Sequence, residues 1–456
     1  MKRKILGLTI FSIVCPFILF GQQNVGIDDL FREDDVIVEN TNVQSSFITN
    51  IEKEAVSLSG SFRFRGLYNF NKEFIKGSTN WSVNSVSADM EANVLFDIRL
   101  KSGLKAFASL YADYSPIGKE DTHYYTSYQT TPSNIITNTA PYVETNNTTF
   151  SIKEIFMDMN INRVVYFRVG KQVLQWGRCY FWNPTDLLNI EKRQFSDLNA
   201  YREGTFALKT HIPFGTFFNI YGVINANDIK NINESAVAAK AECLLGTTEI
   251  SFSTWAKKDF FPVFGFDFIS FIFDTTIRGE ISVSYGDNKS YLKTDILTNG
   301  IIQTNFSTTR ITNEWIPRIS VGFTKRFDFL DVDDRISISG EFFYNPYGYK
   351  ENILKEEDQR LFLLANNLFE LNYNYQYYFA FFTSFSKFIV SEITLSVNAI
   401  GNFNDNSWQI TGGITYEPVD YFTFEFNLSS CIGEDNSEYT FQGNSLSVES
   451  IFTMKF

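Results

Sequence analysis

Every second residue is apolar over much of this sequence, and this alternation is the feature that most restricts its fold. In the segment SFRFRGLYNF, Phe62 and Phe64 lie on one side of an extended chain, and Arg63 and Arg65 lie on the other. Comparable alternation recurs from residue 57 onward, whereas helical periodicity is scarce. The sequence therefore predicts an all-β protein whose strands have one apolar and one polar face.

The composition of the two faces indicates which one points outward. In IRGEISVSY, Ile277 and Ile281 alternate with Arg278 and Glu280, and 48 of the 456 residues are Phe. A β-sandwich buries its apolar faces in a shared core, whereas a transmembrane barrel turns them toward lipid around a wet lumen. Charged residues on the polar face suit a lumen better than a core, so we predict a transmembrane β-barrel.

Connection lengths predict the topology. Tight connections such as KSG, PFG and EPVD alternate with longer polar segments at 115–148, 174–204, 286–312 and 344–374. Short turns on one side and long loops on the other are typical of bacterial outer-membrane barrels. We predict an antiparallel up-and-down barrel of 18 strands, with 16 as the alternative. The expected strands are 55–70, 85–101, 104–114, 149–161, 164–173, 205–213, 216–226, 235–244, 247–257, 263–272, 276–285, 313–326, 332–343, 375–385, 388–401, 407–416, 420–430 and 444–456.

The N-terminal region predicts export. Lys2, Arg3 and Lys4 precede an apolar stretch and Gly21, which is the pattern of a signal peptide spanning 1–21. An uncleaved membrane anchor is the alternative, and no second apolar run is long enough for a transmembrane helix. The acidic residues 22–54 then form a periplasmic extension that is flexible, plugs the barrel or docks a partner, ahead of a barrel at 55–456.

The last strand predicts how the barrel is assembled. Phe452, Met454 and Phe456 share one face of SLSVESIFTMKF. This ending resembles the C-terminal signal that delivers outer-membrane barrels to the barrel-assembly machinery. A barrel in lipid must also close, because an open edge leaves backbone groups unsatisfied. We therefore expect the last strand to pair with the first.

Composition argues against several other classes of protein. A net charge of −13 disfavours nucleic acid as a partner. Besides Cys15 in the predicted signal peptide, the chain has Cys179, Cys243 and Cys431, an odd number far apart, which predicts no disulfide framework. The sequence has two His, His123 and His211, and no zinc-ligand spacing, so we expect no metal and no cofactor. Neither His has a convincing nucleophile nearby in sequence, which disfavours an enzyme.

The connection 174–204 carries more charge than a turn needs. Trp and Tyr near a strand end are typical of an interfacial girdle, and NPTD is typical of a turn with a helix start. Neither explains the mixed charges, so we expect the loop to fold into the lumen and face a ladder of arginines. The candidate pore-lining residues are Arg63, Arg65, Asp97, Arg99, Arg168, Arg178, Asp186, Arg202, Arg278, Glu280 and Arg318.

The same region resembles a known family. GKQ at 170–172, Trp-Gly at 176–177 and NPTD at 183–186 resemble the alginate-export-type barrels and related porin-like proteins. The resemblance implies an 18-stranded outer-membrane barrel that passes a polar, anionic or saccharide solute. The alginate exporter has a strongly basic lumen, and the acidic net charge of this chain departs from it.

Two functions of different classes fit these patterns. The first is an outer-membrane porin for small polar solutes, with lumenal arginines and the charged loop setting selectivity. The alternative is a sealed barrel that acts as a surface adhesin or tethers a polysaccharide through its aromatic loops. The expected partners are outer-membrane lipid, the barrel-assembly machinery and a small polar solute or glycan, and the oligomeric state stays open.

Overall fold

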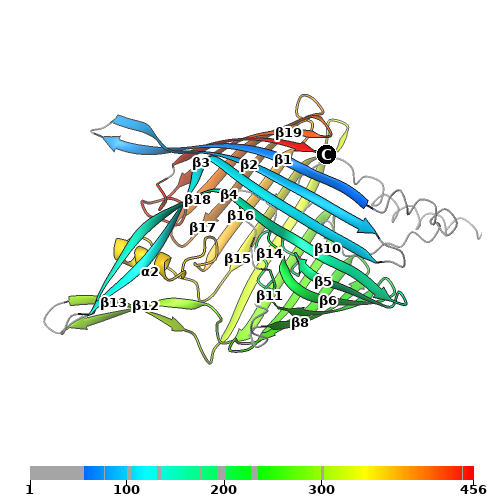
Figure 1. Ribbon diagram of the computed structural model, residues 1–456, viewed down its shortest axis with the longest axis horizontal. Helices are drawn as coiled ribbons and strands as arrows, with labels where there is room; N and C mark the ends of the chain where they lie inside the picture. The colour runs from blue at the N-terminus through cyan, green and yellow to red at the C-terminus, as the bar shows by residue number, and fades with distance from the viewer. Residues whose placement is uncertain are drawn as a thin grey trace, which may run out of the picture. The chain divides into compact units, whose positions relative to one another are not determined.

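A closed antiparallel sheet of eighteen strands forms the body of the protein, as the sequence predicts (Figure 1). The computed structural model describes residues 56–75, 78–99, 104–130, 135–174, 176–189, 192, 195, 202–226, 235–298, 302–443 and 445–456. The predicted signal peptide and acidic extension lie outside these residues. Within them the one helix is α2 (Glu357–Ala365), and it is too short and too polar to cross a membrane.

Each strand of the barrel pairs with its neighbours along the chain, and β12 and β13 form a separate hairpin. The strands are β1 (Val56–Ile75), β2 (Ser78–Arg99), β3 (Lys105–Thr130), β4 (Ile135–Ile161), β5 (Val165–Gln172), β6 (Thr205–Phe214), β7 (Phe218–Asn225), β8 (Ala236–Leu245), β9 (Thr248–Lys257), β10 (Val263–Ile272), β11 (Thr275–Tyr285), β12 (Ser290–Thr298), β13 (Ile302–Arg310), β14 (Trp315–Phe329), β15 (Val332–Tyr344), β16 (Tyr377–Phe385), β17 (Ile393–Asn402), β18 (Ser407–Val419), β19 (Phe422–Ile432) and β20 (Leu446–Lys455).

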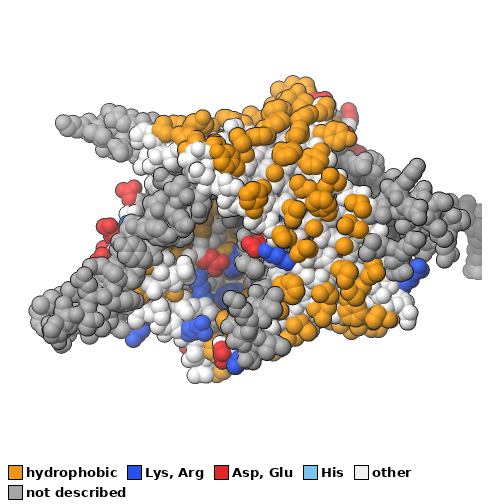
Figure 2. Space-filling model, viewed as in Figure 1, with side chains coloured by type: hydrophobic (Ala, Val, Ile, Leu, Met, Phe, Trp, Pro, Cys, Tyr) orange, Lys and Arg blue, Asp and Glu red, His pale blue; other side chains and the backbone are white. Residues whose placement is uncertain are grey.

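The strands expose their apolar side and bury their polar side, which is the reverse of a soluble β-sandwich. Phe252 and Phe264 are 62% and 57% exposed, whereas Ser251 and Asp267 on the same two strands are fully buried. Figure 2 shows apolar side chains spread over the outer wall, with charged side chains in a hollow beside them. The direction of the alternation decides between the two fold classes in favour of the barrel.

The first and last strands close the sheet. β1 and β20 pair from Ser61 opposite Lys455 to Phe70 opposite Leu446. Beyond this ladder, the N–H of Gly60 donates to the carbonyl of Phe456 at 2.9 Å, and the N–H of Phe456 donates back at 3.0 Å. The ring of Phe456 stacks on Phe62 at 5.5 Å. The terminal residue therefore contributes both backbone and side chain to the seam.

Three segments predicted as loops contain regular structure. β3 and β4 continue as a paired ribbon through most of 115–148, 286–312 contains the β12–β13 hairpin, and 344–374 contains α2. The Tyr and Thr content of 115–148 was the missed signal, because both residue types favour strands. A ribbon outside the membrane needs no apolar face, so the alternation that marks the barrel strands is absent there.

Gly60 gives a direct test of the seam. A Cβ at this position would lie 2.7 Å from the Phe456 ring and would overlap the carbonyl oxygen of Asn93. We expect Gly60→Val to destabilise the folded barrel by about 1–3 kcal/mol through overpacking. The temperature at which the barrel loses its heat-modifiable mobility on gels measures this effect.

Gly222→Val is the matched control, because no atom lies within 4 Å of a Cβ at Gly222 in β7. This variant should unfold at the wild-type temperature. Equal transition temperatures for the two variants would contradict the role assigned to the Gly60–Phe456 contact.

Candidate functional site

The connection that follows β5 leaves the wall through two buried residues. Gly170 has φ +133°, and a Cβ there would overlap the backbone of Ile155 in the neighbouring strand β4. Gln172 is fully buried, and its side-chain N–H donates to the carbonyl of Ala207 at 3.0 Å. Both residues belong to the GKQ segment, so part of that motif forms the point where the loop departs.

In the first half of the loop, hydrogen bonds bring Leu174 and Asn189 together. The N–H of Leu174 donates to Oδ1 of Asn189 at 2.9 Å, and the amide of Asn189 donates to the carbonyl of Leu174 and to the Asp186 carboxylate. The N–H of Asp186 donates to the carbonyl of Asn183 at 3.0 Å, which closes the predicted turn. Asp186 therefore organises the loop itself.

A small apolar core joins this loop to the inner face of the wall. The loop contributes Leu174, Trp176 and Leu188. Strands β6 to β10 contribute small or flat side chains from the face that alternates with the exposed apolar one. The wall residues of this core are Ala207, Val223, Ala236, Ala238, Trp255 and Val263. The loop therefore covers an apolar part of the inner wall, on β6 to β10.

Two buried carboxylates hold the loop by its backbone. Glu341 of β15 accepts hydrogen bonds from the consecutive N–H groups of Tyr180, Phe181 and Trp182, at 2.7, 3.1 and 2.5 Å. Successive N–H groups that point at one centre form a concave anion site, and here the anion comes from the opposite wall. Sequence analysis did not single out Glu341; its only signal is one acidic residue among Ser and Gly in ISISGEFFY.

Glu280 of β11 holds the same loop at two points, one before the 183–186 turn and one within it. It accepts a hydrogen bond from the N–H of Cys179 at 2.6 Å and from the hydroxyl of Thr185 at 2.9 Å. A Cβ at Gly177 would overlap the Glu280 carboxylate and lie 2.6 Å from Oδ1 of Asn183. Gly177 is therefore required for the loop to approach this closely.

The charged side chain of Arg178 lies among acidic residues of the wall. Its guanidinium reaches Glu242 at 2.7 Å, Glu249 at 2.6 Å and Asp267 at 3.5 Å. Lys240 lies beside it and donates to the carbonyl of Trp176 at 2.8 Å. Lys240, Glu242 and Asp267 are buried, and the cluster contains both signs, so each charge has an opposite partner.

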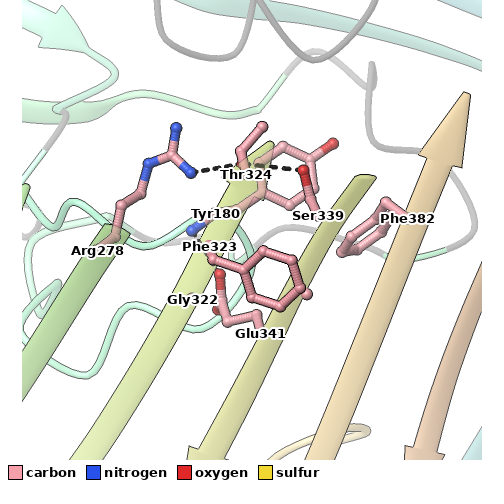
Figure 3. A pocket seen from close by; sticks show the side chains of 9 residues that line it. Tyr180, Arg278, Gly322, Phe323, Thr324, Ser339, Glu341 and Phe382 are labelled. Atoms are coloured by element: carbon pink, nitrogen blue, oxygen red, sulfur yellow. Dashed lines mark hydrogen bonds between the residues drawn. The ribbon is translucent and has the colours of Figure 1, made fainter. Parts of the chain in front are cut away.

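Aromatic residues of the loop pack on aromatic residues of the wall. Tyr180 meets Phe382 edge to face at 4.8 Å, and Trp182 stacks on Phe343 at 5.8 Å with 9° between the rings. Figure 3 shows Tyr180 and Phe382 around a narrow gap with Arg278, whose guanidinium donates to Thr324 at 2.8 Å. Arg278 is the one candidate arginine of the wall that lines this gap.

The other candidates on the strands form ion pairs with residues of the wall or its connections. Arg63 pairs with Glu91 at 3.6 Å, Arg65 with Glu449 at 2.5 Å, Arg168 with Asp158 at 2.6 Å, and Arg318 with Asp287 at 2.6 Å. Asp97 forms ion pairs with Lys105 at 3.3 Å and with Arg99 at 3.6 Å. Arg202 lies at the end of the loop, just before β6, and is half-buried. On the wall, residues 176–185 bond mostly to carboxylates, where the sequence suggested arginines.

The described residues include no group of three or more His, Cys, Asp or Glu arranged to hold a metal ion. Cys179, Cys243 and Cys431 are free thiols, and Cys179 is a buried residue of the loop with its thiol 3.7 Å from the carbonyl of Ser320.

A further buried carboxylate lies outside the strands, in the connection between β19 and β20. Glu438 is 1% exposed and lies close to Asp405, Tyr378 and Tyr439. Burial, reinforced by the negative charge of Asp405, raises the pKa of Glu438 to about 8. This carboxyl group is therefore mostly protonated at neutral pH.

The comparisons with known proteins agree on the fold. No protein-family model and no curated protein sequence matches the chain. OccK8 (OprE) of Pseudomonas aeruginosa superimposes with a TM-score of 0.50 at 10% identity, covering 88% of this chain and 98% of that chain. OccAB3 of Acinetobacter baumannii superimposes with a TM-score of 0.50 at 8% identity, covering 88% and 99%. The chain has the fold of the 18-stranded outer-membrane porins.

Removing the Glu341 carboxylate tests the anchor. In Glu341→Ala, three buried N–H groups lose their acceptor, and each loss costs about 1–3 kcal/mol. We expect amide hydrogen exchange at residues 180–182 to accelerate by about tenfold or more. Glu341→Gln keeps one acceptor oxygen and should show a smaller change; exchange in the Ala variant that matches wild type would contradict the anchor.

The Glu438 carboxyl group predicts a dependence on pH. Its folded pKa of about 8 exceeds the ordinary value of 4.5, so its contribution to stability is complete below about pH 4.5 and is lost as the pH rises through 8. Amide exchange in residues 433–443, corrected for the intrinsic effect of pH, should therefore rise between about pH 5 and 8 and level off above about pH 9. Glu438→Gln should remove the dependence, and a flat wild-type profile would refute it.

Proposed function

We propose that this protein is an outer-membrane channel through which small polar solutes diffuse, and that residues 174–204 narrow its pathway. The observation that carries the proposal is the attachment of the loop. Glu341 and Glu280 bind its backbone, and both occupy positions on the polar face of their strands. The loop therefore lies on the polar side of the sheet. A loop fixed there reduces the open cross-section of the barrel.

The charges along the wall support a solute that is polar without a large net charge. Arg63, Arg65 and Arg168 are each paired with a carboxylate, so the wall offers donors and acceptors of both signs. Small saccharides and zwitterions suit such a surface. A strongly anionic solute would need cations without such partners.

Three finer features belong to the proposal. Export depends on removal of 1–21, and delivery to the barrel-assembly machinery depends on the face that carries Phe452, Met454 and Phe456. Kinship with the alginate-export-type barrels is supported by the GKQ, Trp-Gly and NPTD segments. In those segments, Gln172, Gly177 and Thr185 make the contacts that attach the loop.

Deletion of 178–200 tests the role of the loop. The deletion removes the backbone that Glu341 and Glu280 hold, so the pathway should widen. We expect single-channel conductance in planar bilayers to increase at least twofold, as a wider lumen conducts more current. Heat-modifiable mobility on gels checks that the barrel still folds, and unchanged conductance in a folded variant would refute the proposal.

Liposome swelling separates the channel from the alternative of a sealed adhesin. Wild-type protein in liposomes should admit a small saccharide such as arabinose, and the deletion variant should admit larger sugars. A barrel that admits no solute and binds a glycan at its surface would instead establish the adhesin.

A further inference from the structure

Trp182 lies where three connections of the long-loop side meet. Its side chain is fully buried, and its ring stacks on Phe343 of β15. Its indole N–H donates to the carbonyl of Asn372, in the connection between β15 and β16, at 2.9 Å. Trp182 therefore connects the inward loop to a separate connection, besides the wall contacts described above.

Asn372 uses three different atoms to join three segments. Its carbonyl accepts from Trp182, its N–H donates to Glu438 at 2.7 Å, and its side-chain oxygen accepts from the hydroxyl of Tyr439 at 2.6 Å. Its φ of +70° lies in the left-handed region, which Asn adopts more readily than other residues with a side chain. This backbone conformation is what allows the N–H and the carbonyl to serve opposite partners.

Glu438 ties Asn372 to the ends of the neighbouring strands. Its carboxylate also accepts from the hydroxyl of Tyr378 at 3.1 Å and from the side-chain amide of Asn402 at 2.8 Å. Its own N–H donates to Asp405 at 2.7 Å. The connections 345–376, 403–406 and 433–445 therefore converge on one buried carboxylate.

We propose that Asn372 and Glu438 are positioning residues that hold Trp182, and with it the inward loop, at the wall. A displacement of the outer connections, as on binding of a ligand at the cell surface, would then release the loop and change the solute pathway. The inference extends the proposed function, because it makes the width of the channel depend on the long-loop side.

Cys179 provides a reporter within the loop itself. Its side chain is 3% exposed, so a small charged thiosulfonate reagent should modify it slowly in the folded protein. The measurement uses full-length protein with Cys243→Ser and Cys431→Ser, and peptide mapping by mass spectrometry assigns the label to Cys179. Heat-modifiable mobility checks that every variant is a folded barrel.

Two substitutions break the chain of contacts from opposite ends. Trp182→Phe removes the N–H that Asn372 accepts but keeps an aromatic ring on Phe343, and Glu438→Ala removes the acceptor of the Asn372 N–H. We expect each to raise the rate of Cys179 modification by about tenfold, the effect of losing one buried hydrogen bond. Because both act through Asn372, the double variant should react no faster than the faster single variant.

Two further variants serve as controls. Glu438→Gln keeps an acceptor for Asn372 and should restore a rate near that of wild type. Glu434→Ala changes an exposed residue of the same connection and should leave the rate unchanged. In planar bilayers, Trp182→Phe and Glu438→Ala should each add fluctuations between current levels, which a merely less stable barrel would not produce.

Two results would overturn the proposed role of Asn372 and Glu438. A Cys179 rate that Glu438→Ala leaves unchanged overturns the inference, whatever Trp182→Phe does, and so do additive effects in the double variant. Failure of the proposed function is distinguishable: wild-type liposomes would admit no solute while the Cys179 rates still followed the predicted order.

Discussion

Closure of the sheet is the constraint on which the rest of this structure depends. In lipid, a strand edge without a partner leaves N–H and C=O groups unsatisfied at a cost of several kcal/mol each. β1 and β20 remove that edge with a ladder from Ser61 to Phe70, continued by the reciprocal bonds between Gly60 and Phe456. A closed sheet in lipid must also turn its apolar side outward, which leaves the polar side facing a lumen.

A polar lumen changes how a segment inside it can be held. A loop on an apolar core is fixed mainly by its side chains, and the small core around Trp176 and Leu188 does this near β6 to β10. Farther along, aromatic packing of Tyr180 and Trp182 is joined by backbone N–H groups that need acceptors. Glu341 and Glu280 supply these acceptors from the wall, so buried acidic residues in this barrel serve as structural anchors.

The sequence is sufficient for the barrel and insufficient for the partners of the loop. Alternation specifies a strand such as β11 completely, because Arg278 and Glu280 on one side and Ile277 and Ile281 on the other leave one orientation in lipid. The ribbon of β3 and β4 escaped prediction because its position outside the membrane imposes no such pattern. Some partners of loop residues lie on strands 100 or more residues away, as with Cys179 and Glu280 or Tyr180 and Glu341. No local pattern encodes those distances. The alternation in β11 identified Glu280 as a candidate pore-lining residue, but nothing identified Glu341.

Because Glu341 binds the loop through its backbone, the position of the loop depends little on which side chains it carries. Glu341 binds the N–H groups of residues 180–182, which any residue except proline provides. The side chain of Arg178, by contrast, meets Glu242 and Glu249 and contributes nothing to the Glu341 anchor. Substitutions at position 178 can therefore alter the charge that the loop presents without freeing this anchor. In the channel proposed above, selectivity would then change through one loop while the strands, the seam and the wall carboxylates remain as they are.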